Sequence, residues 1–185
     1  MILPIYVYGN PVLRKVSEDI TPSYAKFETI LANLWETMYS SDGVGLAAPQ
    51  IGLNIRLFVI DGSAMGEDDP SCVGFKKTFI NAKILEQSGE KWAFNEGCLS
   101  LPTIREDVLR QAKIKIQYQD EKFETHVEEY DGLRARIIQH EYDHLEAKLF
   151  IDHINPLRKR LLKKRLENVE RGNVDVSYKI KVHRK

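Results

Sequence analysis

The stretch QHEYDHL, from Gln139 to Leu145, places the pattern His-Glu-x-x-His near the end of an apolar segment. Residues four apart lie on the same face of an α-helix, so His140 and His144 can bind one metal ion together. Glu141 stands next to His140 and can act as a general base for a water molecule in such a site. The stretch therefore predicts a helix that carries a catalytic metal centre.

The helix around this stretch is expected to begin after Asp131-Gly132 and to run through Leu145. Its apolar face continues into the face with the two histidines. The residues of this stripe, spaced four, three and four apart, are Leu133, Ile137, His140 and His144. A buried structural histidine pair is the alternative, but two unpartnered imidazoles on an apolar stripe would be costly to bury. The stripe therefore favours metal binding.

A catalytic metal site usually has three protein ligands and one open position, so a third ligand must come from elsewhere. Cys98 lies in NEGCLSLP, between a glycine and apolar residues, where a strand can present it inward. His126, His153 and His183 are alternatives of the right type, and spacing favours Cys98 only modestly. Cys72 lies in the polar segment GEDDPSCVG, where we expect an exposed loop and a cysteine without a role. Two cysteines are too few for a disulfide framework.

Length and composition are those of a single globular domain over residues 1–185, with 43% hydrophobic and 29% charged residues. Lys plus Arg equals Asp plus Glu at 27 each, so overall charge indicates no particular partner. We do not expect the protein to bind DNA. The N-terminus is broken by Pro4, Gly9 and Pro11 and lacks the pattern of a signal peptide. No apolar run has the length of a membrane span. We expect a cytoplasmic protein without membrane contact.

The periodicities predict an α+β fold, in which antiparallel β-sheets pack around the central metal-binding helix and a C-terminal helix follows. A helix is expected within Tyr24–Ser41, a loop at Gly43–Gly52 and a buried strand at Ile55–Asp61. Short strands in series from Thr78 to Val127 favour antiparallel pairing. Alternation in the last of these strands predicts one shared face for Phe123, Thr125 and Val127.

The end of the chain is expected to form an amphipathic helix at about residues 156–171 and an edge strand at about 174–182. Leucines at helical spacing are expected to bury one face of the helix. The other face carries a basic run, which consists of Arg158, Lys159, Arg160, Lys163, Lys164 and Arg165. The usual explanation of such a run is a solvated face whose long side chains cover apolar stems.

Three segments together resemble the peptide deformylase family. GVGLAAPQIG (Gly43–Gly52), EGCLS (Glu96–Ser100) and QHEYDHL (Gln139–Leu145) match the motifs of that family in order. The resemblance also covers the N-terminal YGNPVLRK and the β region between the motifs. It implies a metal-dependent hydrolase that removes the N-formyl group from the formyl-methionine of newly made polypeptides and releases formate.

The resemblance also implies a role for each group at the site. The implied metal ligands are Cys98, His140 and His144. Glu141 is implied as the general acid and base, and the Gln50 amide and the Leu99 N–H as donors to the oxygen of the tetrahedral intermediate. The implied metal in the cell is ferrous iron, Fe(2+), with Zn(2+), Ni(2+) or Co(2+) as replacements, and the ligand types suit all of these.

Substrate contacts follow from the same resemblance. An extended substrate peptide is expected to pair with backbone near Val44, Gly45 and Gly97. Leu133 and Ile137 are expected in the pocket for the methionine side chain, and Arg105 beside the peptide. Two positions depart from the family, because Thr103 and Ala147 stand where it often has glycine. Both positions shape the backbone, so these residues leave the local loop shape open, but no proposed chemical group is lost.

The expected partners are nascent N-formylmethionyl peptides and, by analogy with bacterial deformylases, the ribosome near its exit tunnel, contacted by the basic run. Asp143 is expected to orient a ligand or pair with Arg110, or else to be a surface charge.

Two other functions compete with this one. An endopeptidase would take its third ligand downstream, and the upstream Cys98 disfavours it. A non-catalytic RNA-binding protein with a structural metal would need four protein ligands and no free base, whereas Glu141 and Gln50 favour catalysis.

Overall fold

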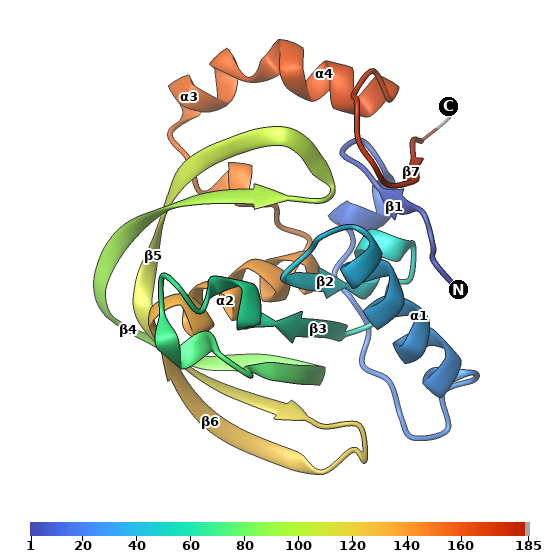
Figure 1. Ribbon diagram of the computed structural model, residues 1–185, viewed down its shortest axis with the longest axis vertical. Coiled ribbons are helices and arrows are strands. Elements are labelled where there is room, and N and C mark those ends of the chain that lie inside the picture. Colours follow the sequence, from blue (N-terminus) through green and yellow to red (C-terminus); the bar gives the residue numbers. More distant parts are fainter. Residues whose placement is uncertain (184–185) are drawn as a thin grey trace.

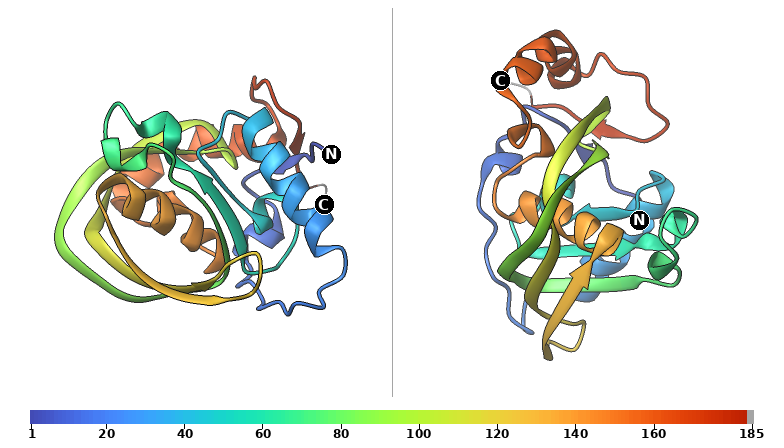
Figure 2. Two further views of the ribbon diagram at one scale, coloured as in Figure 1. Left: turned by 60° about the horizontal axis from the view of Figure 1, so that its bottom comes forward. Right: turned by 90° about the vertical axis from the view of Figure 1, so that its left-hand side faces the viewer.

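A computed structural model describes residues 1–183. At its centre lies helix α2, Gly132–Leu145, which begins one residue earlier than the sequence predicts and ends at the predicted residue. Three strands curve around it: β4 (Lys76–Cys98), β5 (Leu101–Gln119) and β6 (Thr125–Asp131). Figure 2 shows α2 inside this curve. The strand order is β2-β3-β4-β5-β6, with every neighbouring pair antiparallel, so the predicted α+β fold is confirmed.

Helix α2 is buried on almost all sides, although its sequence is apolar along one stripe only. Ten of its fourteen residues are buried, so polar side chains need partners inside the protein. The backbone of the surrounding strands supplies several of them. Arg136 donates to the carbonyls of Trp92 (2.7 Å) and Val108 (2.9 Å), and Gln139 donates to the carbonyl of Gln111 (3.1 Å). The polar face of the helix is thereby fixed against β4 and β5.

Strands β4 and β5 form one long hairpin, where the sequence predicts several short strands. Their register runs from Ile80 opposite Gln119 to Cys98 opposite Leu101. Register shifts occur after Ile80, Ile84, Ser88 and Gly97, and such bulges bend a strand without ending it. The prediction of short strands is therefore wrong, because bulges interrupt the alternation in sequence that would mark a continuous strand.

The face predicted for β6 is confirmed only in part. Thr125 and Val127 share the outer face, where Thr125 is exposed and Val127 is 51% exposed, but Phe123 lies in the preceding turn with φ +61°. The inner face instead carries Glu128 and Tyr130. A carboxylate can occupy this face because hydroxyl and ammonium donors meet it there, and these donors belong to Lys77 (2.6 Å), Tyr118 (2.7 Å) and Tyr130.

The N-terminal half packs on the other side of the sheet. Helix α1, Phe27–Ser40, buries Leu34 and Met38 against the short strand β2 (Gly45–Ala47) and strand β3 (Leu57–Asp61). The loop predicted at residues 43–52 therefore contains an edge strand, followed by a 3-10 helix at Ala48–Ile51. None of the helices within residues 1–183 is long and apolar enough to cross a membrane.

The segment after β3 is less open than the sequence predicts. Two 3-10 turns, Gly62–Met65 and Pro70–Cys72, fold this polar stretch onto the protein. Cys72 is fully buried, so the expectation of an exposed cysteine is wrong. The thiol lies outside the group of possible metal ligands that contains Cys98.

The C-terminal region differs from the prediction in two ways. The expected single helix is divided at Leu162 into α3 (Pro156–Leu161) and α4 (Lys163–Arg171), and both lie over the end of the β4–β5 hairpin (Figure 1). The predicted strand at 174–182 is reduced to β7, Ile180–Lys181, which pairs in parallel with β1, Ile5–Tyr6. Alternate residues from Val174 onward are half-buried, as a strand predicts, but ladder pairing is confined to residues 180–181.

Glu128 provides a test of the packing of β6. Burial raises the pKa of its carboxyl group, but hydrogen bonds from Lys77, Tyr130 and Tyr118 outweigh burial and lower it from 4.5 to about 2. A lowered folded-state pKa stabilises the fold above the unfolded pKa, and this contribution is lost as the pH falls through the folded pKa. We expect Glu128→Gln to lower the free energy of unfolding at about pH 6, with a difference from wild type that shrinks between pH 4.5 and about 2.

Urea unfolding at several pH values measures this difference, and Glu129→Gln is the matched control. Glu129 is the next residue of β6, with a side chain that is 78% exposed. A pH-independent difference between Glu128→Gln and wild type would contradict the assignment.

Candidate metal centre and active site

A cavity of about 480 Å³ opens where β2, the end of β4 and the middle of α2 meet. Segments far apart in the sequence contribute its walls. Val44 and Gly45 come from the β2 edge, Gly97 from β4, and Ile137 and Glu141 from α2. The cavity therefore brings together parts of all three sequence motifs.

Three possible metal ligands converge at the cavity. The Cys98 thiol and one ring nitrogen each of His140 and His144 lie within 4.8 Å of one another, and Sγ of Cys98 lies 3.4 Å from Nε2 of His144. No other Cys, His, Asp or Glu within residues 1–183 belongs to this group. One thiol and two imidazoles with an open side are the donor set of a catalytic site for a divalent transition metal. The chemistry of these side chains fits a metal ion.

The charges around the three groups support the same interpretation. Burial raises the pKa of the Cys98 thiol, but the neighbouring His144 and His140 outweigh burial and lower it to about 5. The thiolate that binds metals is therefore the form present at neutral pH. Burial also raises the pKa of Glu141, to about 7, which is suited to a group that both accepts and returns a proton.

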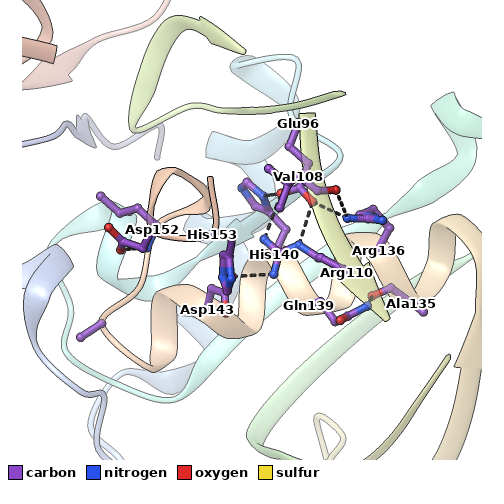
Figure 3. A network of polar contacts seen from close by, with 12 residues as sticks. Glu96, Val108, Arg110, Ala135, Arg136, Gln139, His140, Asp143, Asp152 and His153 are labelled. Carbon is purple, nitrogen blue, oxygen red and sulfur yellow. Dashed lines mark hydrogen bonds and ion pairs between the residues drawn. The ribbon is translucent and has the colours of Figure 1, made fainter. Parts of the chain in front are cut away.

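Glu96 orients the ring of His140 through a contact at Nδ1 (Figure 3). Nδ1 of His140 lies 2.9 Å from Oε2 of Glu96, and an N–H donated there leaves Nε2 as the metal-binding atom. The same carboxylate accepts hydrogen bonds from Arg110 (2.7 and 3.0 Å) and Arg136 (3.0 Å). Burial raises the pKa of Glu96, but His140 and Arg110 outweigh burial and hold it well below its usual range.

The network continues along α2 through Asp143 (Figure 3). Arg110 Nη1 donates to Oδ2 of Asp143 at 2.6 Å, and Nε2 of His153 lies 2.7 Å from the same oxygen. Asp143 is buried, so the surface-charge alternative is wrong and the pairing with Arg110 is confirmed. Sequence reasoning missed Glu96 and Arg136. The signal for Glu96 was its position two residues before Cys98, on the same face of a strand.

Gln50 lies beside the metal-ligand cluster with its amide oriented. Its Oε1 accepts a hydrogen bond from the Ala47 N–H at 2.9 Å, which leaves Nε2 as the end that faces the cluster. Nε2 contacts Oγ of Ser100 at 3.2 Å and Sγ of Cys98 at 3.5 Å. Leu99 occupies the tight turn between β4 and β5, next to Cys98, and also lines the cavity.

Gly45 and Glu141 touch across the cavity wall. A Cβ atom at position 45 would lie 2.5 Å from Oε1 of Glu141, so a larger residue would displace the carboxylate. The other oxygen, Oε2, is buried without a hydrogen-bond partner among residues 1–183. A buried carboxylate with an unused acceptor in a cavity can accept a proton from a molecule bound there.

The predicted substrate-binding residues are only partly brought together. Val44, Gly45, Gly97, Ile137 and Arg105 line the cavity. Leu133 does not, because it is buried at the start of α2, where its N–H is bonded to Asp69. Met65 and Phe94 line the cavity in addition, and no local pattern in the sequence marked either of them.

Comparison with known proteins agrees with this geometry. The family model described as Polypeptide deformylase matches residues 2–160. The chain belongs to the polypeptide deformylase family. The peptide deformylase of Flavobacterium psychrophilum is 52% identical over 189 residues, covering 98% of this chain and 97% of that protein. The peptide deformylase of Christiangramia forsetii is 50% identical over 188 residues, covering 98% and 96%.

Solved structures give the same result. The crystal structure of a peptide deformylase from Legionella pneumophila matches with a TM-score of 0.80 and 32% identity, covering 94% of this chain and 98% of that one. Polypeptide deformylases are metal-dependent hydrolases that remove the N-formyl group from nascent peptides, and this chain is one of them. The expected activity is confirmed, and the alternatives of an endopeptidase and of a non-catalytic RNA-binding protein are wrong.

Glu96 gives a test of the metal centre that does not depend on turnover. We expect Glu96→Gln to weaken metal binding by about 10- to 100-fold, because His140 loses its carboxylate partner and ring orientation. Competition with a chromophoric chelator measures the affinity. The control is Glu86→Gln, an exposed residue of the same strand. Equal affinities for the two variants would contradict the role of Glu96.

Proposed function

We propose that deformylation takes place in this cavity and that the catalytic metal is held by Cys98, His140 and His144. The convergence of these three side chains within 4.8 Å is the observation that carries the proposal. A divalent metal held by these side chains would supply a hydroxide-like nucleophile near neutral pH and a Lewis acid for the formyl carbonyl. We further propose ferrous iron as the metal in the cell, with zinc, nickel or cobalt as replacements that suit the same donor atoms.

Glu141 is the proton carrier in this proposal. With a pKa raised to about 7, its carboxylate accepts the proton of the attacking water at neutral pH. The same carboxyl group then donates that proton to the departing amine. Contact with Gly45 holds the side chain beside the β2 edge, where the substrate is expected.

Gln50 and Leu99 stabilise the negative charge that develops on the formyl oxygen. Each contributes an N–H donor: the side-chain amide of Gln50 and the backbone amide of Leu99. Donors that are fixed before the reaction need no reorganisation during it, which is why such groups contribute strongly to catalysis. The hydrogen bond from Ala47 to Oε1 supports this role, because it fixes the orientation of the Gln50 amide.

The substrate peptide is proposed to add as a strand between β2 and the end of β4. β2 is an edge strand, paired only with β3, so the backbone around Val44 and Gly45 is available on its other side. Gly97 lies across the cavity, with the Arg105 side chain folded over it and bonded to Asn95. Main-chain pairing explains how peptides of different sequence can bind. Ile137 supplies apolar surface for the methionine side chain.

The experiment that tests this function measures formate release from formyl-Met-Ala-Ser by protein loaded with Fe(II) without oxygen. We expect Glu141→Gln to lower kcat by at least about 100-fold at matched metal content, because the variant keeps the shape of the side chain but cannot carry the proton. The control is Glu146→Gln, at the end of the same helix and outside the cavity lining.

Wild-type protein that binds metal but releases no formate would overturn the proposed site. Activity of Glu141→Gln close to wild type would remove Glu141 from its role. Parallel loading with zinc, nickel and cobalt compares the candidate metals.

We propose in addition that the enzyme works in the cytoplasm beside the ribosome, where nascent chains emerge, and contacts ribosomal RNA through the basic run. Part of the run is engaged within the protein. Arg158 pairs with Glu106 at 2.9 Å, Lys159 pairs with Asp152 at 2.7 Å, and Arg165 bonds the Thr103 carbonyl. The most available cations are therefore Arg160, Lys163 and Lys164, all exposed.

We expect the triple variant Arg160→Glu, Lys163→Glu, Lys164→Glu to lose co-sedimentation with ribosomes at low salt, because phosphate contacts dominate such binding. Its activity on formyl-Met-Ala-Ser should not change. The control reverses three exposed lysines of the sheet region, Lys91, Lys113 and Lys122, for the same change in net charge. Equal co-sedimentation of the two triple variants would refute a specific role of the basic run.

A further inference from the structure

The segment between α4 and β7 forms part of the wall of the active-site cavity. It leaves α4 at Gly172, in the left-handed conformation with φ +74°, and returns toward β1 (Figure 1). Its half-buried residues alternate with exposed ones, and two of the half-buried residues, Val176 and Tyr178, line the cavity. The family model ends at residue 160, so this wall lies outside the part of the chain that the model matches.

Tyr178 is held in place from its C-terminal side. The Ile5 N–H donates to the carbonyl of Lys179 at 2.8 Å, at the start of the pairing between β1 and β7. The side chain of Asn10, which is buried, donates to the carbonyl of Lys181 at 2.8 Å. The backbone next to Tyr178 is thus tied to the N-terminal strand, and its side chain has a defined direction.

The hydroxyl of Tyr178 donates a hydrogen bond to the carbonyl of Leu99 at 2.8 Å. Burial raises the pKa of Tyr178, so the hydroxyl remains a donor at neutral pH. The ring packs on the same apolar cluster as the Leu99 side chain. The contact therefore combines a directed hydrogen bond with apolar packing.

The turn that Tyr178 contacts is braced from several directions. The Tyr8 N–H donates to the Ser100 carbonyl at 2.9 Å, and Nε2 of Gln50 contacts the Ser100 hydroxyl at 3.2 Å. These two contacts fix Ser100, whereas the hydroxyl of Tyr178 fixes Leu99. Leu99 is the residue whose N–H is the proposed oxyanion donor, and it directly follows Cys98.

We propose that Tyr178 is a positioning residue for deformylation, which holds the Leu99 backbone so that its N–H meets the developing oxyanion. The inference rests on the proposed role of Leu99. An oxyanion donor is effective only when it is fixed at the position that the charged oxygen will occupy. Small displacements of reacting groups reduce the rate strongly, while ground-state binding of the substrate is less affected. The segment after α4 thereby takes part in catalysis without touching the reacting atoms.

A purely structural role for the segment predicts a different result. If Tyr178 only tied the end of the chain to the fold, loss of its hydroxyl would lower the melting temperature and leave kcat unchanged below it. A positioning role predicts a lower kcat in a protein that remains folded, with little change in KM.

The decisive variant is Tyr178→Phe, which keeps the ring and removes one hydrogen bond. We expect kcat for formyl-Met-Ala-Ser to fall about 3- to 10-fold, the range for one net hydrogen bond, with KM within about twofold of wild type. The matched control is Tyr39→Phe, which also loses one hydroxyl hydrogen bond, to Asp61 at 2.7 Å, on an exposed surface. The control should keep wild-type kcat and KM.

Amide hydrogen exchange gives a second readout that does not need turnover. In Tyr178→Phe, exchange in the peptide that spans residues 96–102 should become several-fold faster, while peptides from α2 should be unchanged. Unchanged exchange at residues 96–102, an unchanged kcat, or a rise in KM alone would each overturn the inference.

The kinetic results distinguish a failure of this inference from a failure of the proposed function. Wild-type protein without formate release overturns both. Active wild-type protein with an equally active Tyr178→Phe variant overturns the inference alone.

Discussion

The carboxylate of Glu96 is fully enclosed by Arg110, Arg136 and His140, and the burial of α2 depends on this contact. Moving an isolated charge into a protein interior costs several kcal/mol, and breaking a buried pair leaves a charge without compensation. Here each buried cation meets a carboxylate or a backbone carbonyl. A helix with a polar face can therefore lie inside the curved sheet, where its histidines reach the active-site cavity.

The same contact connects the fold to the chemistry. Glu96 and Cys98 are two residues apart on β4. The end of this strand therefore carries one proposed metal ligand, Cys98, and the hydrogen-bond partner of a second ligand, His140. A hydrogen bond from Nδ1 of His140 to Glu96 leaves Nε2 for the metal. A shift of β4 relative to α2 would therefore move both Glu96 and Cys98 away from His140. Buried ion pairs of this kind add little net stability, but they select one arrangement of the elements.

The cavity itself is made from segments that meet only in the folded chain. Gly45 comes from an edge strand, Cys98 and Leu99 from the end of a long hairpin, and Tyr178 from beyond the last helix. An unpaired strand edge on a protein surface can pair with other chains and cause aggregation, but beside a cavity it can bind an extended peptide. Because Gly45 has no side chain, the carboxylate of Glu141 can lie directly against the backbone of β2.

The sequence by itself determined the α+β class, the helix α2 to within one residue at its start, and the two histidines of that helix that could bind a metal. These features depend on residue type and on spacing within one helical turn, which are local. It did not determine the inner face of β6, where the half-buried Glu128 meets Lys77 from β4. Nor did it determine the length of the β4–β5 hairpin, the burial of Cys72, or the place of Tyr178 in the cavity wall. Alternation marks two faces of a strand, but which face is buried depends on partners far away in the chain, and only the tertiary structure supplies them.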